Sequence, residues 1–128
     1  MLKAMIDPKL LQATIDDLRD NPNAVELAAG MDIIHEDGST EPIYCESSPS
    51  QQFSDFVGYL YEHELLDMNY IENEKKLGSK DIAEYTQAEA ITKLTYIIRG
   101  DRFCSGLIYE SFKNGELLKL LEQIQKTN

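Results

Sequence analysis

Residues 86–106, TQAEAITKLTYIIRGDRFCSG, combine a helix start, an apolar helical face and a charged corner. Thr86 and Glu89 have the spacing of a capping box, in which each side chain accepts a hydrogen bond from the other residue's backbone N–H group. The apolar side chains that follow recur at helical intervals, at Ile91, Leu94 and Ile98. This pattern predicts a helix over about residues 87–100.

The charged corner after this helix contains Arg99-Gly100-Asp101, the tripeptide that extracellular adhesion proteins present to integrins. Integrin recognition needs a mobile loop on a secreted protein, whereas this tripeptide lies between two apolar helical runs. The opening residues, MLKAMIDPKLLQ, lack the long apolar run of a secretory signal, and no later run is long enough to span a membrane. We therefore interpret the tripeptide as coincidental and expect a cytoplasmic protein.

Further helices are predicted on both sides of this stretch. Asp7-Pro8 is a typical pair for an N-cap and a first helical turn. Ser48 and Gln51 have capping-box spacing, with Pro49 at the first helical position. With the apolar periodicity, these signals predict helices over about residues 8–20, 49–66, 103–113 and 116–126.

A β-hairpin is predicted between the first two of these helices. Asp37-Gly38 supplies the positive φ of a tight turn and lies between two short apolar runs, so we predict strands within about residues 31–45. An isolated hairpin is marginally stable in water, and we expect this one to lie against helices. The fold class is therefore mainly α, a compact single-domain bundle of four to six helices over residues 1–128 with the small hairpin packed on it.

The charge distribution is the strongest feature of the composition. The net charge is −11, and residues 20–74 contain thirteen Asp or Glu and no Lys or Arg. Such a surface repels nucleic acid and anionic membranes, so we expect neither as a direct partner. It attracts a basic protein, although a solvated acidic surface without a partner is the simpler interpretation.

Residues suited to metal binding or nucleophilic catalysis are few. The cysteines and histidines lack the short spacings of a zinc site, and we expect no metal and no cofactor. Cys104 lies on the apolar face of a predicted helix, which favours a core position over a nucleophile. No phosphate-binding glycine loop and no set of nucleophile, base and oxyanion donor is recognisable. The full supply of cysteine and histidine side chains is Cys45, Cys104, His35 and His63.

The corner at residues 99–106 has two interpretations, and both stay open. Arg99 and Arg102 are able to bind a phosphate or carboxylate in a bidentate manner, in a pocket that also includes Tyr61. Alternatively, Asp101 accepts hydrogen bonds from Arg99, Arg102 or backbone N–H groups and sets the angle between two helices. In that case Phe103 anchors the corner in the core, and Gly106 allows the helices to approach closely.

The same corner resembles a motif of the uncharacterised bacterial domain-of-unknown-function family 6508. The motif, R-x-D-R-F-x-x-G, is followed by a second glycine and a leucine-rich tail. In this chain the matching residues are Arg99, Asp101, Arg102, Phe103, Gly106, Gly115 and Leu121. An upstream P-Y segment and an F-x-x-x-L-Y helix are similar to Pro42, Tyr44, Phe56, Leu60 and Tyr61.

Two positions depart from this pattern. Met68-Asn69-Tyr70 stands where the family often has F-D-W, and Leu107 stands where a histidine often follows the motif glycine. The resemblance implies a bacterial or phage protein and no particular reaction. The leading functional hypothesis is an acidic interaction or accessory module without catalysis, which binds a basic partner through residues 20–74. The alternatives are a small-molecule or anion (nucleotide or phosphate) binding domain that uses Arg99 and Arg102, and an enzyme of unrecognised type.

Overall fold

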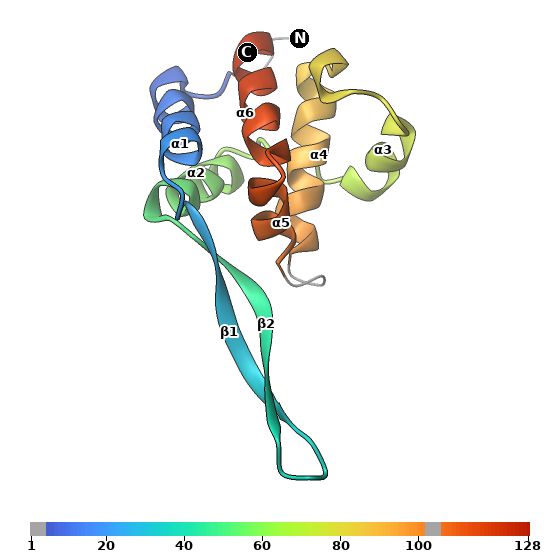
Figure 1. Cartoon of the computed structure of the whole chain (residues 1–128). Helices are drawn as coiled ribbons and strands as arrows, with labels where there is room; N and C mark the ends of the chain where they lie inside the picture. The colour runs from blue at the N-terminus through green and yellow to red at the C-terminus, as the bar shows by residue number, and fades with distance from the viewer. Residues whose placement is uncertain (1–4, 102–105) are drawn as a thin grey trace.

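The computed structural model describes residues 5–101 and 106–128, and for residues 28–33 and 41–46 it describes the backbone alone. The described part contains six α-helices and a two-stranded antiparallel hairpin, so the predicted mainly α fold class is confirmed (Figure 1). The elements in chain order are α1 (Pro8–Asp20), β1 (Val25–Ile34), β2 (Thr40–Pro49), α2 (Gln51–Glu62), α3 (Tyr70–Leu77), the 3-10 turn η1 (Ile82–Glu84), α4 (Gln87–Gly100), α5 (Leu107–Lys113) and α6 (Glu116–Thr127).

Helix α6 is at the centre of the helical body. It lies between α1 and α4 in Figure 1 and contacts both, as well as α5 and η1. Four of its apolar side chains are fully buried: Leu117, Leu120, Leu121 and Ile124. Helix α2 adds two buried aromatic rings, Phe53 and Phe56, whose centroids lie 6.5 Å apart. Burial of these faces is the main favourable contribution to the stability of the body.

The helix starts follow the predicted capping chemistry at two of three places. Asp7 accepts a hydrogen bond from the Lys9 N–H group and begins α1. The capping box at the start of α4 is present in full. The box predicted at Ser48 and Gln51 is wrong, since Pro49 is the last residue of β2. Ser50 is the N-cap of α2, and its hydroxyl accepts from the Phe53 N–H group.

Helix α2 ends at Glu62, four residues earlier than predicted. The chain turns there through Glu64, which has a left-handed φ of 54°. The Leu65 N–H group donates to the Leu60 carbonyl and the Glu64 N–H group to the Tyr61 carbonyl, the two hydrogen bonds of a Schellman motif. Between this turn and α4, where no helix was predicted, the chain forms a helix of eight residues, α3.

Helix α5 begins at Leu107 rather than at residue 103. Gly106 precedes it with a φ of +86°, a left-handed conformation that does not continue a helix. Residues 102–105, which include Arg102, Phe103 and Cys104, lie outside the described residues. No described helix is long and apolar enough to cross a membrane.

The hairpin is longer than predicted, and only its base touches the helices. Its register runs from Val25 opposite Pro49 to Ile34 opposite Thr40, with irregular pairing between Ala28 and Asp32. The base contacts α5 and α2, and the rest projects away from the body (Figure 1). The Ile34 side chain is accordingly 76% exposed. We call residues 25–49 the arm.

The tip of the arm has the predicted Asp-Gly turn. Gly38 has a φ of +85°, and its N–H group donates to the His35 carbonyl. The Asp37 carboxylate accepts hydrogen bonds from the Ser39 hydroxyl at 2.6 Å and the Ser39 N–H group at 2.9 Å. These two hydrogen bonds lower the pKa of Asp37, the hydroxyl having the larger effect. The turn is therefore fixed by its own side chains and does not need contact with the body.

Candidate functional site

Asp101 connects the end of α4, the start of α5 and the base of the arm. Its Oδ1 atom accepts hydrogen bonds from the Ile108 N–H group at 2.9 Å and from the Ser47 hydroxyl at 2.7 Å. The Ser47 oxygen in turn accepts from the Tyr109 N–H group at 3.0 Å. Gly106, the N-cap of α5, has no side chain to cap the helix, so Asp101 and Ser47 together satisfy two of its first N–H groups.

Of the donors expected for Asp101, a backbone N–H group is present, from Ile108. Arg99 instead interacts with tyrosines, and Arg102 and Phe103 lie outside the described residues. Ser47 was missed by sequence reasoning because it lies 54 residues from Asp101 and on a strand that was predicted to end earlier. The hydrogen bonds of Asp101 therefore join the base of the arm to the start of α5.

The two glycines of the corner lie close to side chains of neighbouring elements. A Cβ atom on Gly100 would lie 2.7 Å from Leu107 Cδ2, so Gly100 allows α4 and α5 to approach closely. A Cβ atom on Gly106 would lie 3.1 Å from Leu27 Cδ2, on the arm. The described neighbour of Gly106 is thus on the arm, whereas a close approach of two helices was predicted for this residue. The absence of a side chain at Gly106 permits the left-handed backbone conformation and leaves room for the contact with β1.

Arg99 lies beside two tyrosines at the end of α4. Its guanidinium carbon is 5.7 Å from the centre of the Tyr70 ring, in cation–π geometry. Interaction with the Tyr70 hydroxyl, the largest contribution, and with Tyr61 raises the pKa of Arg99. Arg99 and Tyr61 therefore lie close together.

The aromatic surface continues from Tyr70 to Tyr96 on α4. The two rings meet edge to face, with centroids 6.5 Å apart. Lys93 Nζ lies 5.1 Å from the centre of the Tyr96 ring and 3.2 Å from Glu74 Oε1. We call Tyr61, Tyr70, Tyr96 and Arg99 the tyrosine face.

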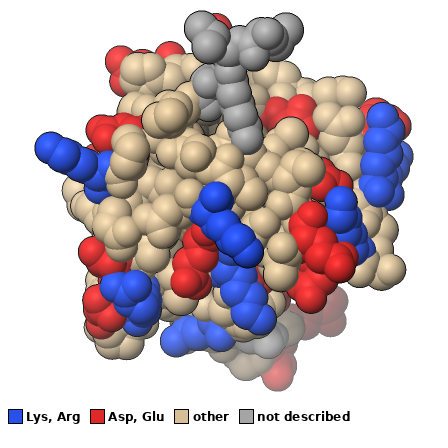
Figure 2. Space-filling model, turned by 90° about the horizontal axis from the view of Figure 1, so that it is seen from above, with Lys and Arg blue, Asp and Glu red and all other residues tan. Residues whose placement is uncertain are grey.

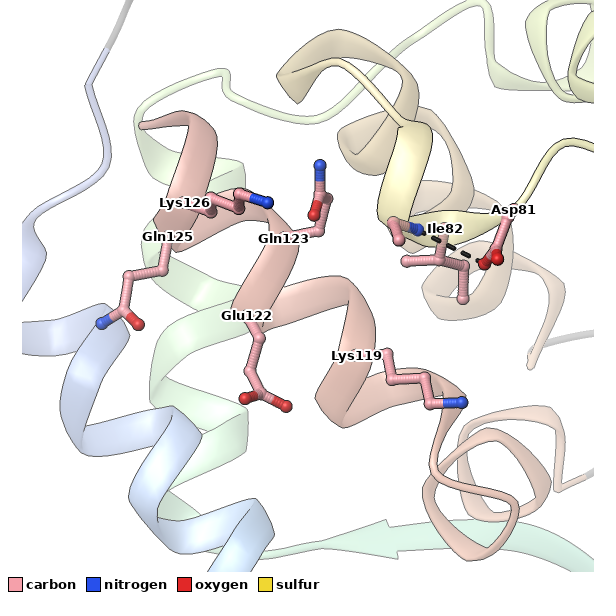
Figure 3. A pocket seen from close by; sticks show the side chains of 8 residues that line it. Asp81, Ile82, Lys119, Glu122, Gln123, Gln125 and Lys126 are labelled. Atoms are coloured by element: carbon pink, nitrogen blue, oxygen red, sulfur yellow. Dashed lines mark hydrogen bonds between the residues drawn. The ribbon is translucent and has the colours of Figure 1, made fainter.

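A wide groove of about 600 Å³ lies between η1 and α6 (Figure 3). Its charged side chains alternate in sign, with Lys119, Glu122 and Lys126 on α6 and Asp81 beside η1. The charged side chains that line the groove are exposed, whereas Gln123 is buried. Gln123 donates to the Tyr85 carbonyl at 2.7 Å and holds η1 against α6, which gives this region a structural role.

A second groove, of about 390 Å³, lies beside Asp67. The Asp67 carboxylate accepts hydrogen bonds from Asn73 at 2.9 Å, from the Thr92 hydroxyl at 2.7 Å and from the Asn69 N–H group at 2.8 Å. Desolvation, the largest single contribution, opposes ionisation, yet these hydrogen bonds together lower the pKa of Asp67. The carboxylate is thus already hydrogen-bonded by groups of the protein itself. Because Asn73 lies on α3 and Thr92 on α4, the network fixes α3 on α4.

The side chains able to bind a metal lie apart from one another in the described part of the chain. Within residues 5–101 and 106–128, no group of three or more His, Cys, Asp or Glu side chains is arranged to hold a metal ion. His63 packs against the Tyr59 ring at 4.4 Å, whereas His35 lies at the exposed tip of the arm. The side chain of Cys45 is not described. The surfaces with a distinct chemistry are therefore the arm and the tyrosine face.

Comparison with known proteins identifies a family and no function. Searches of curated proteins and of solved structures give no match. The sequence matches a family described as a family of unknown function, DUF6508, over residues 6–128. This match includes the arm, the Asp101 corner and the tyrosine face, and covers nearly the whole chain. The chain therefore belongs to the DUF6508 family.

Proposed function

We propose that the protein is a non-catalytic interaction module whose acidic arm docks onto a basic partner protein. The observation that carries this proposal is the projection of a purely acidic hairpin from the helical body (Figure 1). The arm contains six carboxylate residues and no Lys or Arg: Glu26, Asp32, Glu36, Asp37, Glu41 and Glu46. Because these charges share a narrow projection and repel one another, a cationic partner relieves the repulsion.

The helical body differs from the arm in its charge pattern. Seen from above, its Lys and Arg side chains lie next to Asp and Glu (Figure 2). The ion pairs of the body include Arg19–Asp16, Lys75–Glu72, Lys80–Glu89 and Lys93–Glu74. Outside the arm, 12 Lys and Arg residues balance part of the negative charge of 17 Asp and Glu residues, whereas the six carboxylate residues of the arm have no basic residue among them. This difference supports the arm as the surface that meets a basic partner.

The backbone of the arm adds a second reason to expect docking. The described sheet has two strands, so each strand has one edge without a neighbouring strand. Such an edge is able to pair with an extended segment of another protein, and charged side chains along it select which segments approach. The hydrogen bonds between Ser47, Asp101 and Tyr109 hold the base of the arm and reduce the entropy lost on docking.

A small-molecule or anion site is the weaker candidate. Of the three residues expected to form this site, Arg99 and Tyr61 lie close together, and Arg102 lies outside the described residues. The grooves beside η1 and beside Asp67 are lined by residues other than Arg99, which is half-buried. Small ligands are usually bound in concave sites that bury most of their surface.

The proposal is tested by neutralising the arm. The variant Glu26→Gln/Glu36→Gln/Glu41→Gln removes three charges and leaves Asp37, which the turn needs. The matched control, Glu84→Gln/Glu110→Gln/Glu122→Gln, removes three charges from exposed positions of the body. Wild type and both variants are used to capture proteins from native cells, and the binding of each captured protein is then measured with purified components.

The arm variant is expected to lose a basic partner that the body control still binds. Wild-type binding is expected to weaken steeply as salt rises from about 0.05 M to about 0.5 M, because salt screens exposed charges. A partner that binds the arm variant as tightly as the wild type would contradict the proposal. Equal losses in both variants would also contradict it, because net charge rather than the arm would then be responsible.

A further inference from the structure

The tyrosine face contains exposed aromatic side chains, and exposed apolar residues lie near Tyr70 in the sequence. Tyr61 and Tyr96 are exposed, and Met68 and Ile71, two positions before and one after Tyr70, are 77% and 56% exposed. These four account for most of the large exposed apolar side chains in the described part of the chain. Tyrosine, methionine and arginine are also the residue types that are enriched at protein interfaces. The face therefore has the composition of a docking surface.

The aromatic side chains of this face are held in place before any partner binds. Tyr70 packs edge to face on Tyr96, and Arg99 lies over the Tyr70 ring. The Lys93–Glu74 ion pair joins α4 to α3 beside them. Fixed aromatic side chains lose little conformational entropy when a partner covers them, which favours affinity.

We propose that the tyrosine face binds an extended, mostly apolar segment of another protein that presents one carboxylate to Arg99. Charge complementarity carries this choice of occupant. The ion pairs found among the described residues involve Arg19, Lys75, Lys80 and Lys93, so the Arg99 guanidinium has no carboxylate partner among them. A guanidinium retains donors for a bidentate contact with a carboxylate after it has met the tyrosine hydroxyls.

The surrounding charges restrict the occupant further. Glu62, Glu64 and Glu72 are exposed close to the face in the sequence, and they disfavour a segment with many carboxylates. The net charge of −11 disfavours a second copy of this chain. A segment of another protein fits these restrictions if its apolar side chains pack on Tyr61 and Tyr96 and if it carries a single Asp or Glu. This inference is independent of the proposed docking of the arm.

Selection of random peptides by phage display on the immobilised wild-type protein provides the test. Selection at about 0.5 M salt suppresses binding to the acidic arm, because charges farther apart than a few Å are then screened. We expect the enriched peptides to combine Leu, Ile, Phe or Trp with one Asp or Glu. The most enriched peptide is synthesised with a fluorescent label, and its binding to wild type and variants is measured by fluorescence polarisation.

Arg99→Gln and Tyr96→Ala are each expected to weaken the binding of this peptide about tenfold. Lys113→Gln is the matched control, since Lys113 also lies over aromatic rings, at 5.5 Å from Tyr109, but on α5. Its effect is expected to stay within about twofold. Thermal melts of all variants verify that each one is folded.

Several results would overturn the inference. They are the absence of enriched peptides, enriched peptides without a carboxylate, unchanged binding by Arg99→Gln, and equal losses in Arg99→Gln and Lys113→Gln. Displacement of the peptide by inorganic phosphate or acetate alone would also overturn it, in favour of a small-anion site. The arm variant Glu26→Gln/Glu36→Gln/Glu41→Gln should bind the peptide as wild type does, which separates this test from that of the arm.

Discussion

The helical body and the arm of this protein differ in burial, in charge and in the contacts that their side chains make. Most side chains of the body pack in the core, cap helices or form local ion pairs. Leu120, for example, is fully buried in α6. The arm exposes its tip, carries one sign of charge and touches the body only at its base. A hairpin of this kind adds little to stability by itself. We therefore expect substitutions in the body to affect stability most, and under the proposed function those in the arm to affect binding.

The largest expected change in unfolding free energy comes from comparing a core substitution in the body with a substitution in the arm. Leu120→Ala removes a fully buried side chain from α6 and is expected to cost about 2–5 kcal/mol of unfolding free energy. Ile34→Ala, near the tip of the arm, is expected to change it by less than about 0.5 kcal/mol. Urea denaturation followed by circular dichroism measures both values. Similar losses in the two variants would show that the arm is part of the packed core.

The junction between the two regions gives the next largest effect. Asp101→Asn removes the charge from the acceptor shared by Ser47 and Ile108, and we expect a loss of about 1–3 kcal/mol. Ser47→Ala is expected to cost about 1 kcal/mol, because the Tyr109 N–H group loses its acceptor. The double variant should cost less than the sum, since both residues belong to one network.

A double-mutant cycle by urea denaturation tests this coupling, and hydrogen exchange at Ile108 and Tyr109 reports on the hydrogen bonds themselves. The neighbouring exposed residue provides a control, because Ser48→Ala should leave both stability and exchange unchanged. Strictly additive losses for Asp101→Asn and Ser47→Ala would mean that the two side chains act separately. The arm would then not be attached through the corner.

How much of this architecture the sequence predicts also differs between the two regions. In the body, helices 8–20 and 87–100 were predicted with their observed bounds, because Asp7-Pro8 and the Thr86 capping box are local signals. Helix α3 was missed, since it has few apolar residues and depends on tertiary contacts such as Lys93 with Glu74. Local chemistry predicts an element only when that element is stabilised locally.

The arm illustrates the same limit. Its turn was predicted from Asp37-Gly38, but its length was not, because Ala28, Ala29 and Gly30 give a weak strand signal at the point where the pairing is irregular. The candidate site was predicted in part. Arg99 and Tyr61 were chosen from their residue types, whereas Ser47 became visible only once the register of β2 placed it beside Asp101.

The smallest expected effect is a stabilisation of the body that leaves the arm unchanged. Glu64 has a φ of 54° in the Schellman turn after α2, a position where an L side chain is strained and glycine is not. Glu64→Gly should therefore raise the unfolding free energy by about 0.5–1 kcal/mol, after allowing for the greater entropy of glycine in the unfolded chain. Glu64→Ala removes the same charge but keeps the Cβ atom.

Comparison of these two variants separates backbone strain from charge. If strain is the cause, urea denaturation will show Glu64→Gly to be more stable than wild type, while Glu64→Ala gains little. Equal gains in both variants would instead mean that the carboxylate itself destabilises this acidic region. Because Glu64 lies outside the arm, neither variant should alter the binding of a basic partner by more than about twofold. A larger loss in both would extend the docking surface from the arm onto the body.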